Sequence, residues 1–316
     1  MKIKHLAPVY ISVYIRIEHL KKNIEALQKN FLANKTELFL FSDAPKKGDE
    51  IKVFKMRQYL KTITGFKSVN IVYRRKNSRV YNNQNAQKSL LKKYGKVIIM
   101  EEDIVTAPGF LTFMNQSLEI YKDREDILCI SGYCPPIDIQ KTYKEDVILL
   151  DRMYGWSLAI WEAKYKKIKN IKEKELNKLI DLDLKNELIQ KGEEDLIYFF
   201  KAFSQNLFYG LDVKANYLIF KNKMYSISPA KSLVFNIGLD GSGLHSGKTQ
   251  LYDTILSNEI NFKMNKNIKL NDNVLNIHYE FRRFASYSRA SKNYISRNIV
   301  QLINLNIKYS LLSVNI

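Results

Sequence analysis

Apolar runs of strand length alternate with segments of helical period through the first third of the chain, and this alternation restricts the fold more than any other feature. The apolar runs lie at 6–15, 37–43, 69–74 and 96–100, and the segments between them, at 18–31, 51–63 and 87–95, repeat apolar residues at helical spacing. Strands that are almost wholly apolar are typical of a parallel sheet covered by helices on both faces. The sequence therefore predicts the α/β class, with Gly95 ending the third helix.

The same pattern continues beyond the fourth apolar run. A helix is expected over 108–121 and a strand over 127–133, and the segment 162–209 is dense in Lys, Glu and Leu, which predicts helices that cover a cleft. The stretch SLVFNIGLDGSGLHSG at 232–247 is polar and rich in glycine. Glycine suits positions where the backbone turns sharply or approaches a ligand closely, so we expect an ordered loop there.

The charge balance requires an acidic partner, because 51 basic residues against 32 acidic residues give a formal charge of +19. Nucleic acid, anionic lipid and phosphorylated small molecules all satisfy this requirement.

The two cysteines, Cys129 and Cys134, are too few for a disulfide framework or a cysteine-ligated zinc site, and we expect buried thiols in a reducing cytosol. No stretch reaches the roughly 18–20 apolar residues that cross a bilayer, so any contact with a membrane is expected from the side.

Three acids in a row, Glu101, Glu102 and Asp103, follow the apolar run KVIIM. Ligands of open parallel sheets bind beyond the carboxyl ends of the strands, and Mg²⁺ and Mn²⁺ prefer carboxylate oxygens, with phosphate and water as further ligands. If the backbone stays extended, Glu101 and Asp103 share one side and Glu102 points to the other. The residues alone leave two interpretations open, a metal and nucleotide-diphosphate site or a solvated turn.

The C-terminal segment 281–316 contains no acidic residue, and its apolar and aromatic residues are interleaved with bases. Its basic residues are Arg282, Arg283, Arg289, Lys292, Arg297 and Lys308. This pattern is typical of a helix that lies on anionic lipid, and equally of a helix packed on the domain with a solvated basic face. We therefore expect a domain over 1–250 and a basic, helical extension over 251–316, packed on that domain or on a membrane.

Five segments, taken together, carry a resemblance to a known family. They are PVYISVYIRIEHLKKNIEAL, LFLFSDAPKK, the acid triplet EED with IVTAPGFLTFMNQSLEIY, DRMYGWSLAIWEAKY and SLVFNIGLDGSGLH. In this order the chain resembles the GT-A glycosyltransferases, and within them the bacterial sugar transferases related to N-acetylglucosaminyltransferase I. Those enzymes carry EDD after a strand, then GW-x-x-A-x-W and N-x-G-x-D-G-S-G-x-H. The resemblance covers roughly residues 6–247 and implies a GT-A, Rossmann-like, mostly parallel sheet flanked by helices.

The resemblance implies a donor site in which Asp103 and His245 hold Mn²⁺ or Mg²⁺ and Asp43 contacts the base of the nucleotide. The other donor-binding residues are Tyr14, Arg16, Arg79, Glu101 and Glu102. Having EED in place of EDD keeps a carboxylate at every position. The residues by themselves admit simpler roles, because Asp43 lies in the turn-rich SDAPKKGDE and a lone histidine such as His245 is often structural.

The resemblance further implies that Gly155 and Trp156 shape the sugar and acceptor pocket and that Asp212 is the catalytic base, although Leu211 replaces the family's tryptophan. The alternative bases are Glu194 and Asp195, in QKGEEDLIYFF. A helix N-terminus also explains acids at that place, and Trp156 alone is equally explained as a side chain at the edge of the core.

The function implied is a metal-dependent, inverting hexosyl- or N-acetylhexosaminyltransferase. It uses a UDP-sugar as donor and a hydroxyl of a glycan or lipid-linked glycan as acceptor, in bacterial capsule or lipopolysaccharide assembly. The expected location is the cytoplasm, peripheral at the inner face of the plasma membrane, with segment 281–316 on anionic lipid.

A sugar nucleotidyltransferase is the first alternative, although VYIRIEHL lacks the glycine-rich loop of that class. A nucleic-acid-binding protein is the second, although strand-end acids repel phosphate, and we expect no nucleic-acid partner.

Overall fold

A computed structural model describes residues 5–77, 79–172, 175–176, 182–205, 210–243 and 247–291, with the backbone alone at 79–82, 182–183 and 287–291. Eight strands form one sheet: β1 (Val9–Val13), β2 (Glu37–Ser42), β3 (Ser68–Tyr73), β4 (Lys96–Glu101), β6 (Ile127–Ser131), β7 (Val147–Leu150), β8 (Ser157–Trp161) and β9 (Tyr225–Pro229). Two short strands, β5 (Ile104–Thr106) and β10 (Val234–Asn236), pair antiparallel to each other.

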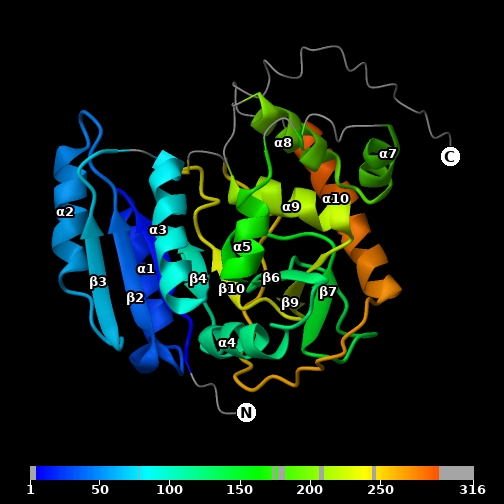
Figure 1. Cartoon of the computed structure of the whole chain (residues 1–316), viewed down its shortest axis with the longest axis horizontal. Helices are drawn as coiled ribbons and strands as arrows, with labels where there is room; N and C mark the ends of the chain where they lie inside the picture. The colour runs from blue at the N-terminus through cyan, green and yellow to red at the C-terminus, as the bar shows by residue number, and fades with distance from the viewer. Residues whose placement is uncertain are drawn as a thin grey trace.

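The strand order of the large sheet is β3-β2-β1-β4-β8-β6-β9-β7 (Figure 1). Strands β3, β2, β1 and β4 are parallel neighbours, while β8 runs antiparallel to both β4 and β6. The pair β6 and β9 is again parallel, and β7 closes the sheet antiparallel to β9. The predicted α/β class with a mostly parallel sheet is therefore confirmed.

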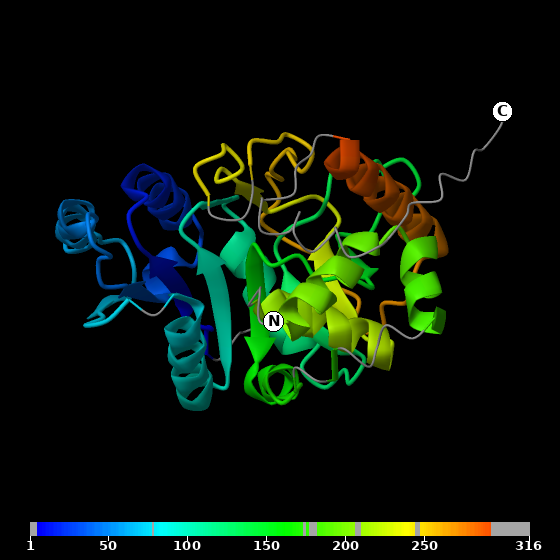
Figure 2. The ribbon, with the colours of Figure 1, turned by 90° about the horizontal axis from the view of Figure 1, so that it is seen from above.

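The helices flank this sheet in the way that apolar strands require. They are α1 (Ile17–Gln28), α2 (Glu50–Leu60), α3 (Arg79–Tyr94), α4 (Phe110–Ile120), α5 (Glu162–Lys169), α7 (Leu182–Gln190), α8 (Glu194–Ser204), α9 (Leu211–Asn222) and α10 (Asp272–Ser291), with a short 3-10 helix at Ala33–Lys35. Figure 2 shows α1 and α2 on one side of the sheet and α3 and α5 on the other.

Side chains divide into two cores, one on each face of the sheet. Strand β1 shows why, because Val9, Ile11 and Val13 join the core under α1, α2 and α4, whereas Tyr10 points into the core under α3, α5 and α9. This alternation follows from the two-residue period of a strand. Both cysteines lie in these cores, so the predicted buried thiols are confirmed.

Most predicted elements are confirmed, and the largest differences have local causes. Gly95 ends α3 in the left-handed conformation, with φ of 73°, as the glycine stop predicted. The helix itself begins at Arg79, earlier than the predicted start at 87. The sequence prediction missed these residues because the polar stretch NNQN at 82–85 interrupts the apolar period. The glycine-rich stretch at 232–247 contains the strand β10, which pairs with β5.

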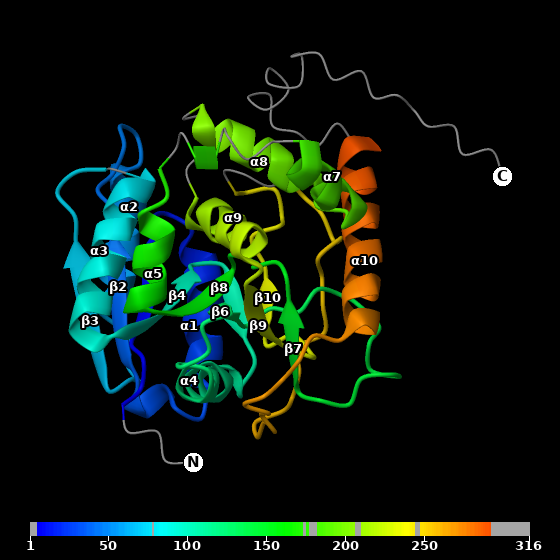
Figure 3. The same ribbon diagram turned by 45° about the vertical axis from the view of Figure 1, so that its right-hand side comes forward.

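The segment that follows β10 crosses back over the sheet and ends in α10, which stands beside α7 and α8 (Figure 3). Tyr252, Ile268 and Val274 from this segment belong to the same apolar core as β1. The predicted boundary at residue 250 stays a prediction, and 292–316 lie outside the described residues. Among the helices that the structure describes, none has the length and hydropathy of a membrane span.

Candidate active site

The parallel half of the sheet brings the predicted donor residues to one edge. Val13 pairs with Ser42 across β1 and β2, and Ser12 pairs with Glu101 across β1 and β4, so these strands end at the same level. The chain beyond each strand carries predicted site residues: Tyr14 and Arg16 after β1, Asp43 after β2, and Glu102 and Asp103 after β4. Open α/β sheets bind ligands at such an edge.

Arg16 holds two of the three acids. Its Nε donates to Oε1 of Glu102 at 2.9 Å and its Nη2 to Oδ2 of Asp103 at 2.6 Å. The backbone N–H of Tyr14 donates to the other oxygen of Glu102 at 2.8 Å. The prediction that Glu102 points away from Asp103 is wrong, because β4 ends at Glu101 and the next two residues form a turn. Strand alternation does not apply in a turn, so both carboxylates reach one guanidinium.

The glycine-rich loop closes over this turn. The N–H of Ile237 donates to the carbonyl of Asp103 at 3.0 Å. A Cβ placed on Gly238 would lie 1.9 Å from Oδ2 of Asp103 and 3.0 Å from Nη1 of Arg16. Only a glycine permits this approach, since no real Cβ lies so close to another heavy atom. The loop therefore contacts the acid turn directly. The sequence predicted an ordered loop at 232–247 but not this contact.

The rest of the loop is described only in part. His19 and Asp240 are joined by a contact of 3.1 Å between Nε2 and Oδ2, and Ser242 donates twice to the other oxygen of Asp240. These Ser242 hydrogen bonds hold the pKa of the Asp240 carboxyl at about 2. His245, the second predicted metal ligand, lies outside the described residues, so its role stays a prediction.

Asp103 has the chemistry of a metal ligand on one of its two oxygens. Oδ2 is paired with Arg16, while Oδ1 is buried and has no hydrogen-bond partner among the described residues. A buried oxygen without a partner destabilises the folded state unless a cation or a hydrogen-bond donor contacts it. Within the described part of the chain no group of three His, Cys, Asp or Glu side chains converges on one point. The residues therefore fit a Mg²⁺ or Mn²⁺ ion held by one or two carboxylates, with phosphate and water as its other ligands.

Asp43 is buried at the end of β2, where its Oδ1 accepts from the N–H of Ala44 at 3.1 Å. Arg57 fixes the same corner, because its Nη2 donates to the carbonyls of Asp43 and Arg74 at 3.2 and 3.1 Å. These contacts account for Asp43 as a turn residue and leave its predicted contact with a base as a prediction. The side chain of Arg79 lies outside the described residues.

A pocket of about 140 Å³ brings together the predicted acceptor residues. Its lining includes Gly155, Trp156, Asp212, Asp195, Tyr252 and Arg152. Asp212 stands in the first turn of α9, and its Cβ would lie 3.3 Å from a Cβ added to Gly155. The indole of Trp156 also packs edge-on against Tyr252, with 5.7 Å between the ring centroids. Trp156 thus both lines the pocket and packs against the core.

Glu101 connects this pocket to the acid turn. Burial, together with the negative charges of Asp103 and Asp212, raises the pKa of the Glu101 carboxyl to about 8. The Glu101 side chain is exposed to solvent. The charges of Asp103 and Asp212 both act on it, although these two residues are far apart in sequence.

One of the two alternative bases, Asp195, belongs to a buried ionic cluster that the sequence did not reveal. Arg152 and Arg282 both pair with Glu193 and Asp195, and Nη2 of Arg282 lies 2.6 Å from Oδ1 of Asp195. Arg282 is only 1% exposed. Its predicted place on a solvated or lipid-facing basic surface is therefore wrong, because α10 turns this side chain onto the N-terminus of α8. Glu194 does not take part in these ion pairs within the described residues.

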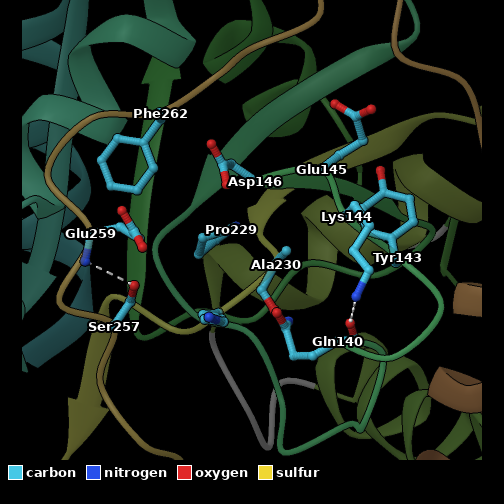
Figure 4. Close-up of a pocket in the computed structure, with 11 residues that line it drawn as sticks. Gln140, Tyr143, Lys144, Glu145, Asp146, Pro229, Ala230, Ser257, Glu259 and Phe262 are labelled. Atoms are coloured by element: carbon cyan, nitrogen blue, oxygen red, sulfur yellow. Dashed lines mark hydrogen bonds between the residues drawn. The ribbon is translucent and has the colours of Figure 1, made fainter.

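A larger pocket of about 340 Å³ lies elsewhere, between the segment 140–146, the end of β9 and the segment 257–262, and holds no predicted site residue. Figure 4 shows Glu145, Asp146, Glu259 and the ring of Phe262 around it. Asp146 is already engaged, since its Oδ2 accepts from the N–H of Lys263 at 2.7 Å. We place the candidate active site at the smaller pocket, because its lining contains the predicted residues Gly155, Trp156 and Asp212.

Comparison with solved structures gives distant matches. The crystal structure of S. aureus TarS residues 1–349 matches at 9% identity with a TM-score of 0.39, over 73% of this chain and 60% of that chain. The mannosyltransferase PcManGT from Pyrobaculum calidifontis, in complex with GDP-Man and Mn²⁺, matches at 12% identity with a TM-score of 0.35, over 54% of this chain and 49% of that chain. TarS 1–349 in complex with UDP-GlcNAc matches at 12% identity with a TM-score of 0.35, over 50% of this chain and 46% of that chain.

These matches span less than two thirds of the structures concerned. TM-scores this low establish neither a family nor an activity. No protein-family profile matches the chain, and no curated protein matches it.

Proposed function

We propose that this chain is a metal-dependent, inverting glycosyltransferase of the GT-A type. It moves a hexose or N-acetylhexosamine from a nucleoside diphosphate, UDP in our proposal, to a hydroxyl of a glycan or lipid-linked glycan. One observation carries the proposal: Asp103 has a buried oxygen that lacks a partner among the described residues, and its charge acts on Glu101 together with that of Asp212, which lines the pocket beside Trp156. A cation on Asp103 and a sugar in this pocket would complete the site.

On the donor side, Asp103 and His245 would hold Mn²⁺ or Mg²⁺. When bound, the cation neutralises the charge that develops on the departing diphosphate. Arg16 fixes the side chains of Asp103 and Glu102, because it donates a hydrogen bond to each. Tyr14, Asp43, Arg79 and Glu101 complete the proposed donor site around the phosphates, base and sugar.

On the acceptor side, Trp156 and Gly155 would border the sugar and Asp212 would act as the base. In an inverting transfer the acceptor oxygen forms a bond to the anomeric carbon while the bond to the diphosphate breaks. The hydroxyl proton then passes to the Asp212 carboxylate. We prefer Asp212 because it lies beside Gly155 in the pocket, whereas Arg152 and Arg282 hold Asp195 in the buried ion-pair cluster. Glu194 is less suitable, because it is absent from the lining of the pocket.

We extend the proposal to bacterial capsule or lipopolysaccharide assembly, with the protein in the cytoplasm at the inner face of the membrane. Support for this setting comes from the excess of 19 positive charges, which favours an anionic lipid surface and a phosphorylated donor. A nucleotidyltransferase has less support, since the segment after β1 contains no glycine.

The test is a thermal-shift series with UDP, UDP-sugars and GDP-mannose, each with Mn²⁺ or with a chelator. A ligand at about 100 times its Kd stabilises the native state by about 2.7 kcal/mol, which raises Tm by several degrees. We expect this rise only with Mn²⁺, its loss in Asp103→Asn, and its retention in Asp138→Asn, an exposed control. Asp212→Asn should keep the rise and lose transfer. The proposal fails if no nucleoside diphosphate or sugar nucleotide raises the Tm of the wild type with Mn²⁺.

A further inference from the structure

Positive charge is concentrated in one part of the chain. Residues 46–76 hold ten basic and two acidic side chains, so eight of the nineteen excess charges fall in about a tenth of the sequence. This segment forms α2 and the edge strand β3. Its exposed bases are Lys47, Lys52, Lys55, Lys61, Lys67, Arg75 and Lys76. Of these, Lys52 pairs with Asp49 and Lys67 with Glu37, while Lys47, Lys55 and Lys61 form no ion pair with described residues.

Two large apolar side chains stand among these bases. Ile51 is 72% exposed and Phe54 is 61% exposed, and both lie on the outer face of α2. They are three residues apart and therefore neighbours on the helix surface. The opposite face of the helix is the one that packs, through Val53, Met56 and Leu60. Figures 1 and 2 show α2 at the outer edge of the molecule with no other element over it.

We propose that the outer face of α2, formed by Ile51, Lys52, Phe54 and Lys55 with Lys47 before the helix and Lys61 after it, is a docking surface for an anionic lipid bilayer. Exposed apolar side chains flanked by lysines along the chain match the boundary between acyl chains and acidic headgroups. Nucleic acid would pair with the lysines and leave Ile51 and Phe54 in water. The lysine stems extend their charges around the apolar pair, so both interactions form at once.

This surface lies close to the candidate active site. Asp49, the residue before α2, accepts a hydrogen bond from the Tyr14 hydroxyl at 2.8 Å, and the Tyr14 backbone donates to Glu102. Two hydrogen bonds thus join the N-terminus of α2 to the acid turn. Lipid docking does not depend on the proposed function, but if that function holds, the bound protein presents its cleft beside a membrane that carries a lipid-linked acceptor.

The experiment is vesicle co-sedimentation of the full chain, with phosphatidylcholine vesicles that contain about one-third phosphatidylglycerol. We compare the wild type with Ile51→Glu/Phe54→Glu and with a control pair, Phe31→Glu/Ile255→Glu. The control residues are 59% and 91% exposed, and both pairs change the net charge equally. We expect the first pair to weaken binding by about tenfold or more and the control pair to bind within about twofold of the wild type. Binding should also fall with salt and on pure phosphatidylcholine.

Three results would overturn the inference: no sedimentation of the wild type, equal loss in both pairs, or full binding by the Ile51→Glu/Phe54→Glu protein, which would assign binding to another surface. Sedimentation equilibrium measures whether the protein self-associates instead. If the wild type self-associates, stays off vesicles and becomes monomeric in this variant, the face joins two copies of the chain instead. Sugar-nucleotide binding, measured by Tm, separates failure of this inference from failure of the proposed function, because the substituted residues lie outside the cleft.

Discussion

At the scale of single residues, the candidate site depends on a close contact between the glycine-rich loop and the acid turn. Gly238 leaves no room for a side chain, since a Cβ there would overlap Oδ2 of Asp103 at 1.9 Å. Arg16 donates to the same oxygen of Asp103 at 2.6 Å and fixes the carboxylate there. A methyl group at residue 238 would therefore have to displace the carboxylate that we assign to the cation.

We predict that Gly238→Ala abolishes the Mn²⁺-dependent rise in Tm with a UDP-sugar. The matched control is Gly48→Ala, where a Cβ meets nothing within 4 Å but φ is 92°. That control should lower stability by roughly 1 kcal/mol through backbone strain and leave the ligand response unchanged. Thermal shift with and without ligand measures both effects. Equal ligand responses in the two variants would show that Asp103 is not the cation ligand.

The raised pKa of Glu101 leads to a second prediction at this scale. Its folded pKa of about 8 stands above the usual value of 4.5, so between these values the folded state binds a proton that the unfolded state has lost. The free energy of unfolding therefore falls as pH rises through this window. In the metal-free protein, Tm should fall from pH 5 to pH 9, and Glu101→Gln should flatten this decline. Thermal denaturation in chelator measures both proteins, and parallel curves would contradict the assignment.

At the scale of elements, the C-terminal helix is tied to α8 by buried charges. Arg282 and Arg152 share Glu193 and Asp195, and a Cβ on Gly192 would lie 2.7 Å from the backbone nitrogen of Arg283. The neighbouring His278 adds a polar contact, since its Nε2 lies 2.8 Å from the Tyr154 hydroxyl. Burial and the charges of Arg282 and Arg152 lower the pKa of His278 well below its usual value, so the imidazole is neutral.

Removing one partner from this cluster leaves an uncompensated buried charge. We predict that Arg282→Ala lowers the free energy of unfolding by about 3–5 kcal/mol. Arg283→Ala, its exposed neighbour on the same helix, should change it by less than about 0.5 kcal/mol. Urea unfolding followed by circular dichroism compares the two. Similar midpoints would mean that α10 is held by its apolar side chains and that the ion pairs add nothing.

The elements also show how far sequence reasoning reaches. Strand and helix periods predicted the α/β alternation, and the strand-end rule predicted that the acids at 101–103 lie at the carboxyl end of a strand. The same reasoning missed that Arg16 holds Glu102 and that Arg282 is buried. These pairs join residues 86 and 89 positions apart. Local pattern contains no signal for them, because only the packed fold decides which charges meet. Composition alone would place the acids at 101–103 and the bases at 282–283 on the solvated surface, yet Glu102, Asp103 and Arg282 are buried.

At the scale of the whole molecule, the segment after β10 and the sheet form one core. Tyr252 packs edge-on against Trp156, and Ile268, Val274 and Ala285 join the apolar cluster that contains β1. The ion pairs between α8 and α10 then close the side of the candidate pocket, since Arg282 and Asp195 both line it. The pocket therefore exists only when this segment is in place.

Unfolding of this segment and of the sheet should consequently be a single event. Trp156 reports the segment through its contact with Tyr252, and Trp161→Phe removes the other tryptophan of the chain. We predict that in Trp161→Phe the urea midpoint from tryptophan fluorescence equals the midpoint from far-ultraviolet circular dichroism, because one shared core leaves no part to melt alone. The wild type serves as the control for the substitution. A fluorescence midpoint at lower urea would mean that the C-terminal segment separates first, and that the acceptor pocket opens while the donor edge of the sheet remains folded.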